Sequence, residues 1–96
     1  MTGKQRKQLT KLGHELSPVV YIGKSGLSDE VVKAAGKALA DHELIKIRFV
    51  DFKKSKEDIS RSIAERTGST LIRVLGNIAL LYKENPDPEK RQIEVS

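Results

Sequence analysis

The stretch Val19-Val20-Tyr21-Ile22-Gly23-Lys24-Ser25-Gly26-Leu27-Ser28-Asp29-Glu30 decides how the chain is organised. It begins with an apolar run typical of a β-strand and continues through a Gly-Lys-Ser-Gly loop. It then reaches Ser28, a good helix N-cap that two acidic residues follow. The order strand, loop and helix is therefore predicted here.

The loop over residues 23–26 has the properties of an anion site. A loop that opens a helix directs unpaired N–H groups and the positive end of the helix dipole at whatever lies in front of it. Gly23 and Gly26 have no Cβ atom, so a bulky backbone can approach closely, and Lys24 adds a positive charge. A GXXG loop holds a nucleic-acid backbone in this way in KH domains. Two glycines at this spacing also serve simply to turn a strand into a helix, and both interpretations stay open.

The Gly-Lys-Ser sequence is not a nucleotide-hydrolysing P-loop. The pattern GxxxxGK[ST] would require glycine at position 18, where this chain has Pro18. No triad, paired-carboxylate spacing or activating base for Ser25 is apparent in the sequence, so we expect no catalytic residue. A small phosphate-handling enzyme, in which the fold brings His14 to Ser25, is the enzymatic alternative.

Composition and charge limit the partners. The 96 residues suit one small domain, and the formal net charge of +5 is concentrated at one end. Residues 1–26 contain five basic residues and one acid, namely Lys4, Arg6, Lys7, Lys11, Lys24 and Glu15. A polyanion is the natural partner of such a surface. The chain has no cysteine, and its two histidines are not grouped with carboxylates that could complete a metal site. We therefore expect no metal and no cofactor.

The sequence gives no sign of a membrane segment. No stretch approaches the roughly 20 apolar residues that span a bilayer, and the N-terminus lacks the apolar core of a signal peptide. We therefore expect a cytoplasmic protein with no membrane partner and no small-molecule substrate.

A first helix is predicted over residues 2–16. Thr2 and Gln5 fit a capping box, and Pro18 is expected to end the helix. Leu9, Leu12 and Leu16 recur at helical spacing and form one apolar stripe. A basic outer face lies well away from that stripe and consists of Lys4, Lys7, Lys11 and His14.

The rest of the chain predicts the order αβαβαββ. Helices are expected over about 29–41 and from Ser55 to Gly68, with strands over 44–50, 69–75 and 78–83; Gly76-Asn77 is a hairpin signal. Lys46 and Arg48 project from one face of a strand about 7 Å apart, which roughly matches phosphate spacing. Lys53, Lys54 and Lys56 form a further basic run. The fold class is α+β, with a mixed four-stranded sheet in one domain over 1–84 and a polar tail over 85–96.

Several fragments in a fixed order carry a family resemblance. They are Lys4-Gln5-Arg6 with Leu9, Leu12 and His14; Pro18-Val19-Val20; Ile22-Gly23-Lys24-Ser25-Gly26-Leu27; His42-Glu43-Leu44-Ile45-Lys46; and Gly76 with Leu80-Leu81-Tyr82-Lys83. In order and spacing the chain resembles the YhbY-type, or CRM, family of RNA-binding domains. Tyr21 and Ala79 are mild departures. The role of Tyr21 stays open, either as a core residue or as a stacking contact. Base stacking on the sheet is not expected, because the chain lacks the clustered aromatics of an RRM.

The resemblance implies a fold like the C-terminal domain of translation initiation factor three and a function in binding structured RNA. Stand-alone bacterial members are associated with large ribosomal subunit precursors, and plant relatives assist group II intron splicing. The implied contacts are the loop residues Gly23, Lys24, Ser25 and Gly26 and the basic first helix with Lys4, Arg6, Lys7 and Lys11. The expected partner is therefore large-subunit ribosomal RNA or its precursor particle. A general RNA chaperone or an intron-splicing factor is the alternative.

Overall fold

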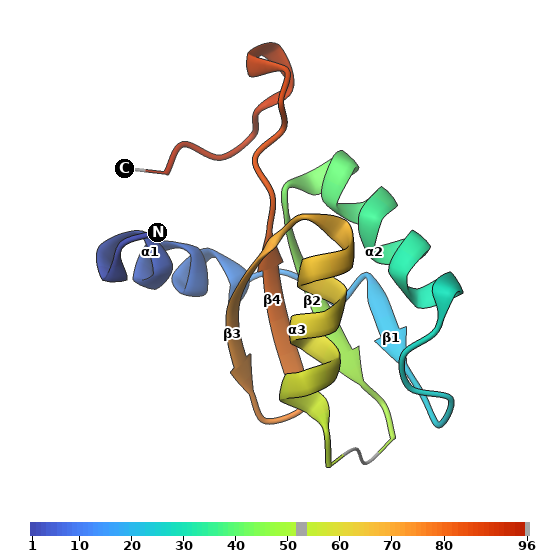
Figure 1. Cartoon of the computed structure of the whole chain (residues 1–96). Coiled ribbons are helices and arrows are strands. Elements are labelled where there is room, and N and C mark those ends of the chain that lie inside the picture. The colour runs from blue at the N-terminus through green and yellow to red at the C-terminus, as the bar shows by residue number, and fades with distance from the viewer. Residues whose placement is uncertain (52–53, 96) are drawn as a thin grey trace.

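A computed structural model describes residues 1–51 and 54–95 (Figure 1). Its elements follow the predicted order αβαβαββ. They are α1 (Gly3–Gly13), β1 (Val20–Ile22), α2 (Asp29–His42), β2 (Leu44–Phe49), α3 (Lys56–Thr67), β3 (Thr70–Leu75), β4 (Ile78–Tyr82) and a short 3₁₀ helix η1 (Pro88–Lys90). Lys53, in the predicted basic run, lies outside the described residues.

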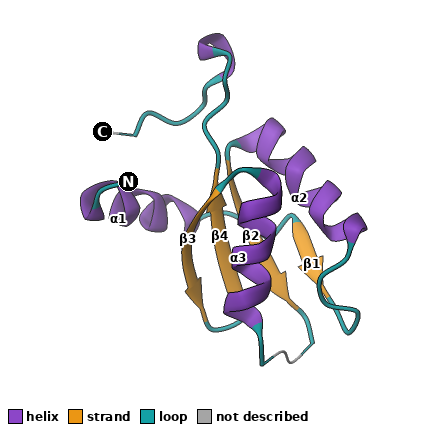
Figure 2. Ribbon diagram, viewed as in Figure 1, coloured by secondary structure: helices purple, strands orange, loops and turns teal. Residues whose placement is uncertain are grey.

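The four strands form one mixed sheet in the order β1-β2-β4-β3. Strands β1 and β2 are parallel and joined through α2, whereas β4 is antiparallel to both β2 and β3. The last strand therefore lies inside the sheet (Figure 2). The pairing of β3 with β4 shifts between Leu71 and Arg73, so that Ile72 is an extra residue in a β-bulge.

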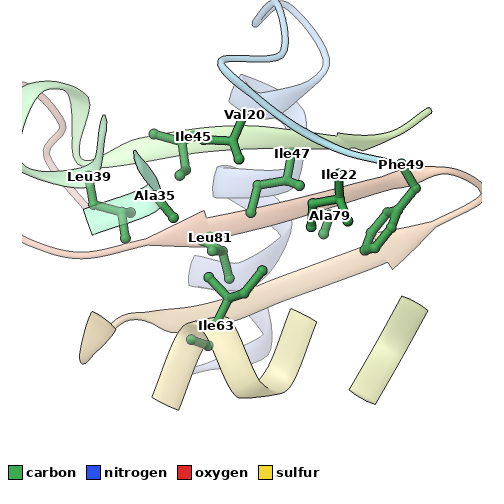
Figure 3. Close-up of a cluster of buried hydrophobic side chains, with 11 residues drawn as sticks. Val20, Ile22, Ala35, Leu39, Ile45, Ile47, Phe49, Ile63, Ala79 and Leu81 are labelled. Carbon is green, nitrogen blue, oxygen red and sulfur yellow. The ribbon is translucent and has the colours of Figure 1, made fainter. Parts of the chain in front are cut away.

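Helices α2 and α3 cover one face of the sheet and enclose the larger core. Alternate residues of β2, such as Ile45, Ile47 and Phe49, point toward these helices and are fully buried. Figure 3 shows them with side chains from β1, β4, α2 and α3. Each large aliphatic side chain buried in this way contributes about 1.5–3 kcal/mol to folding.

Helix α1 lies on the opposite face over a smaller core. Leu9 of the helix packs there with Leu44, Ile72, Leu80 and Tyr82. The end of the helix approaches β4 closely, because a Cβ atom on Gly13 would lie only 2.6 Å from Leu80 Cδ1. This glycine therefore fixes how near α1 can come to the sheet.

One prediction about a helix end is wrong. Helix α1 ends at Gly13 rather than Leu16, because i→i−3 hydrogen bonds, from Glu15 to Leu12 and from Leu16 to Gly13, replace the α-helical bonds there. Leu12 and Leu16 are 39% and 37% exposed, and of the leucine stripe Leu9 alone is buried. Ser55 is the N-cap residue of α3, which confirms the predicted start of this helix, although its side chain makes no capping bond. The capping box of Thr2 with Gln5 and the C-cap at Gly68 are confirmed.

The carboxylate of Glu43 holds the C-terminal segment against the domain. Glu43 follows α2 with φ +64°, a left-handed conformation that non-glycine residues rarely adopt, and its side chain is buried. Its oxygens accept hydrogen bonds from the backbone amides of Asn85 at 2.7 Å, Gln92 at 2.5 Å and Ile93 at 3.1 Å. Burial by itself would raise the pKa of Glu43, but these amides and Arg91 together hold the pKa below its ordinary value.

Tyr82 has a polar atom that the small core does not satisfy. Its side chain is 7% exposed, and within the described residues its hydroxyl has no hydrogen-bond partner. Burial and the neighbouring carboxylates of Glu43 and Glu84 raise the pKa of Tyr82. The phenol is therefore neutral throughout the physiological pH range.

We expect Tyr82→Phe to raise the free energy of unfolding by about 1 kcal/mol, because it removes a buried hydroxyl without removing a bond. Chemical denaturation of the two proteins measures the difference. A clear loss of stability would mean that the hydroxyl is hydrogen-bonded in solution.

Candidate nucleic-acid interface

Helix α1 leaves part of its sheet face uncovered. Cross-strand pairing places Tyr21 beside Arg48, Arg48 beside Ile78, and Ile78 beside Leu75. The next row contains Lys46, Leu80 and Arg73. Directly opposed residues share a face, and Leu80 belongs to the core under α1, so both rows lie on the α1 side. We call the uncovered part the open sheet face; it consists of Tyr21, Lys46, Arg48, Arg73, Leu75 and Ile78.

The open sheet face is cationic. The described strands contain three basic residues, Lys46, Arg48 and Arg73, and all three lie on this face. None of the four strands contains Asp or Glu, and neither does α1. A surface with one sign of charge on a low-dielectric protein wall attracts a polyanion and raises its rate of association.

The basic face of α1 continues onto the open sheet face. His14, Lys46 and Arg73 line one hollow of about 100 Å³ with Leu75 and Ile78. A groove of about 920 Å³ follows α1 from there, and its walls include Lys4, Lys7, Lys11, His14 and Arg73. The structure thus brings the predicted cations of the first helix and those of β2 into one connected surface.

Arg6 has a different environment from the other predicted contact residues. Its guanidinium Nη1 donates to the carbonyl oxygens of Leu71 at 2.8 Å and Ile72 at 2.5 Å. These carbonyls lie at the bulge of β3, where the regular ladder is interrupted. Arg6 therefore anchors α1 to the edge of the sheet, and an RNA contact would have to use its remaining N–H groups.

The GXXG loop forms a tight turn. The amide of Gly26 donates to the carbonyl of Gly23 at 3.0 Å, and Gly26 has φ +65°. Tyr21, Lys24 and Ser25 line a hollow of about 370 Å³ at this turn, which also contains Glu30. Since the Gly26 amide is used inside the turn, it is not available to an anion, and the positively charged Lys24 side chain is the candidate anion ligand at this hollow.

The start of α2 is already capped by its own residues. The side chain of Ser28 accepts from the amide of Val31 at 3.2 Å, and Asp29 and Glu30 lie in the first turn. Asp29 also pairs with Arg66 of α3 at 2.7 Å. These acids offset part of the positive end of the helix dipole. An anion at the loop would therefore be bound mainly by the turn and Lys24.

The two glycines of the loop should respond differently to alanine. Gly26→Ala places a Cβ atom in the left-handed region and is expected to lower the free energy of unfolding by about 1–2 kcal/mol. Gly23 has an ordinary backbone conformation, and its Cβ would meet Val50 at 4.0 Å, so Gly23→Ala should leave stability nearly unchanged.

Thermal unfolding of both variants checks this prediction. Weaker RNA binding by a stable Gly23→Ala protein would show that Gly23 is needed for close approach of a ligand. Equal destabilisation by the two substitutions would contradict the assignment.

The predicted site residues do not all converge. Figure 1 shows α1 beside the β3 edge and the loop beyond the β1 edge, with the sheet between them. His14 and Ser25 line different hollows, which gives Ser25 no base from that histidine. Of the predicted basic run, Lys56 donates to Asn77 at the hairpin at 3.1 Å. Sequence reasoning missed Arg73, whose side chain joins the surface of α1 to that of β2.

These features define a small α+β domain with one sheet face half covered by a basic helix and otherwise cationic. The chain belongs to the CRS1/YhbY (CRM) domain family, whose model matches residues 1–83. It is 34% identical over 96 residues to "Probable RNA-binding protein YqeI" of Bacillus subtilis, covering 99% of this chain and 98% of that protein. It is 32% identical over 97 residues to "Probable RNA-binding protein PA4753" of Pseudomonas aeruginosa, covering 100% and 93%.

A solved structure confirms the fold. The solution structure of the hypothetical protein SAV1595 from Staphylococcus aureus matches with a TM-score of 0.81 at 28% sequence identity, over 98% of this chain and 99% of that one. The α+β fold with a mixed four-stranded sheet, predicted from the sequence, is thus found both in the chain and in a relative. None of the described helices is long and apolar enough to cross a bilayer.

Proposed function

We propose that this protein binds structured RNA without catalysing a reaction and assists assembly of the large ribosomal subunit in the cytoplasm. The observation that carries the proposal is the acid-free cationic surface that runs from α1 across the open sheet face. Membership of the CRM family and the names of its relatives as probable RNA-binding proteins support RNA as the polyanion.

The proposed mechanism is the positioning of RNA through its phosphates. Lys46, Arg48 and Arg73 would contact phosphates on the sheet, and Lys4, Lys7 and Lys11 would orient a second segment along α1. The loop residues Gly23, Lys24, Ser25 and Gly26 would hold a further phosphate beyond β1. Phosphate contacts carry no sequence information directly, so the choice of target depends on RNA shape.

The test is binding to fragments of large-subunit ribosomal RNA and to matched DNA duplexes over a salt series. Tight binding confined to certain RNA fragments, with a steep salt dependence, would support the proposal and locate the target. Tight binding to unrelated RNAs would favour a general RNA chaperone or an intron-splicing factor instead. Equal weak binding to every polyanion would contradict the proposal.

Lys24→Ala should weaken RNA binding about fivefold at roughly 0.1 M salt and make the salt dependence shallower by about 0.7–0.9, because one phosphate contact is lost. Fluorescence anisotropy of a labelled RNA fragment measures both quantities. Lys90→Ala is the control, since it removes one exposed charge from η1, which lies far from the loop in Figure 1. An unchanged salt slope for Lys24→Ala would remove this residue from the set of contacts.

A further inference from the structure

We propose that Tyr21 and Arg48 form a binding site for one unpaired RNA base beside a duplex. This inference rests on the proposed RNA-binding function and specifies its ligand: a structured RNA with an unstacked nucleotide at the β1 edge of the open sheet face. The site would give the protein a preference for helix ends, bulges or loops over uninterrupted duplex.

The exposure of Tyr21 is the first observation. The side chain is 56% exposed on strand β1, whereas its neighbours Val20 and Ile22 are buried in the large core. A core role is therefore excluded for this aromatic ring. A tyrosine on a strand loses little conformational freedom on binding, and its ring can stack on any base because every base has a π-face.

The neighbours of Tyr21 favour a nucleotide as the occupant. Arg48 is its directly paired residue on β2, and adjacent strands lie about 4.8 Å apart, so both side chains can contact one nucleotide. The Tyr21 ring can stack on a base, and the Arg48 guanidinium can pair with the phosphate of the same nucleotide. Ile78 and Leu75 extend the row, and Leu75 is 56% exposed, so apolar surface continues next to the cations.

Charge complementarity distinguishes RNA from a protein partner of mixed charge. The strands under this row contain basic residues and no acid. The GXXG turn begins two residues after Tyr21, which corresponds to about 7 Å along an extended chain, and Tyr21 lines the same hollow as the turn. A base on Tyr21 and a phosphate at the turn can therefore belong to neighbouring positions of one RNA strand.

The experiment uses the composition of the chain. It contains two tyrosines and no tryptophan, and Tyr82 is buried. A Tyr82→Phe protein therefore has tyrosine fluorescence from Tyr21 alone. The probes are an RNA hairpin with a short single-stranded oligoadenosine overhang and the same hairpin with a blunt end. In the Tyr82→Phe protein, tyrosine fluorescence and anisotropy of the labelled hairpin are recorded with each of the two hairpins. The double variants that also carry Tyr21→Ala or Tyr21→Phe are measured by anisotropy only.

We expect the overhang hairpin to quench Tyr21 fluorescence and to bind about tenfold more tightly than the blunt one, since stacking of one base is typically worth about this factor. Tyr21→Ala should abolish that tenfold preference, so that the overhang hairpin and the blunt hairpin bind with equal affinity. Tyr21→Phe should keep the preference, because the ring and not the hydroxyl makes the contact.

The outcomes separate the two proposals. If both hairpins bind equally and Tyr21 fluorescence does not change, the base site is wrong while RNA binding stands, and the exposed row is left for a protein contact. If Tyr21→Ala weakens binding of both hairpins alike, the ring supports the surface generally and the base site is again wrong. If neither hairpin nor any large-subunit fragment binds, the proposed function itself fails.

Discussion

Replacing Lys46, Arg48 and Arg73 together with glutamine is expected to weaken binding of the target ribosomal RNA fragment about 100-fold at roughly 0.1 M salt. Each phosphate contact contributes about 0.7–0.9 to the salt slope, so three lost contacts multiply to this factor and make the slope shallower by two to three units. The three side chains lie on the rim and open part of one sheet face, where glutamine can replace them without entering the core. Binding titrations over a salt series measure the effect.

A triple variant of equal charge change is the control. Lys33 and Lys37 lie on α2 at the other face of the sheet, and Lys90 lies in η1; all three are exposed. Their replacement by glutamine should reduce RNA affinity far less than loss of the sheet cations. Equal losses in the two variants would mean that net charge alone attracts the RNA. In that case the open sheet face would not be the binding site.

Glu43→Ala should lower the free energy of unfolding by about 2–3 kcal/mol, because it removes a charged acceptor from the amides of Asn85, Gln92 and Ile93. The segment after β4 would then leave the domain, and Ile93 and Val95 would lose their contacts with the small core. Chemical denaturation measures the loss of stability, and amide hydrogen exchange at Gln92 and Ile93 measures release of the segment.

Glu84→Ala is the matched control for this substitution. Its carboxylate is 55% exposed and pairs with Arg91 at 3.2 Å, so its removal should change stability by less than about 1 kcal/mol. A similar loss from both variants would contradict the special role of Glu43. Protected amides at Gln92 and Ile93 in Glu43→Ala would show that other contacts hold the segment.

The pKa of Glu43 gives this attachment a defined pH dependence. Because the pKa is depressed in the folded protein, the stabilisation is complete above the ordinary glutamate pKa and is lost as the pH falls through the folded value. The protection factors of the Gln92 and Ile93 amides, which compare their exchange with that of the unfolded chain at the same pH, should therefore fall in this acidic range. Glu43→Gln, which has no ionisable group at this position, should show lower protection factors at these amides without this pH dependence.

A structural feature could be predicted correctly from the sequence where a single local residue pattern determines it. Alternation along β2 predicted which side Lys46 and Arg48 occupy, and the order of elements was correct because each begins or ends at a clear turn or cap. Arg73 escaped detection because the extra residue Ile72 interrupts the alternation of β3 at that point. Tyr21 could not be assigned, since a strand pattern does not say which face another helix will cover.

Long-range contacts explain the remaining differences. The close approach of α1 to the sheet at Gly13 depends on Leu80, a residue distant in sequence, whereas the local signals predicted only that the helix ends before Pro18. The role of Glu43 depends on amides about 40 to 50 residues later in the chain. Arg6 looked like one more surface cation, yet its partners are carbonyls of a strand near the other end of the chain. No local pattern contains these partners.

The charges of α1 favour ligand affinity at the expense of thermal stability. Its first turn has no acidic residue and contains Lys4 and Arg6, although acids there would complement the helix dipole. The groove beside it is lined by further lysines that repel one another until a polyanion neutralises them. Selection for thermal stability alone would therefore introduce acids into this helix. An unfavourable charge pattern of this kind is what a trade-off between folding and binding would produce.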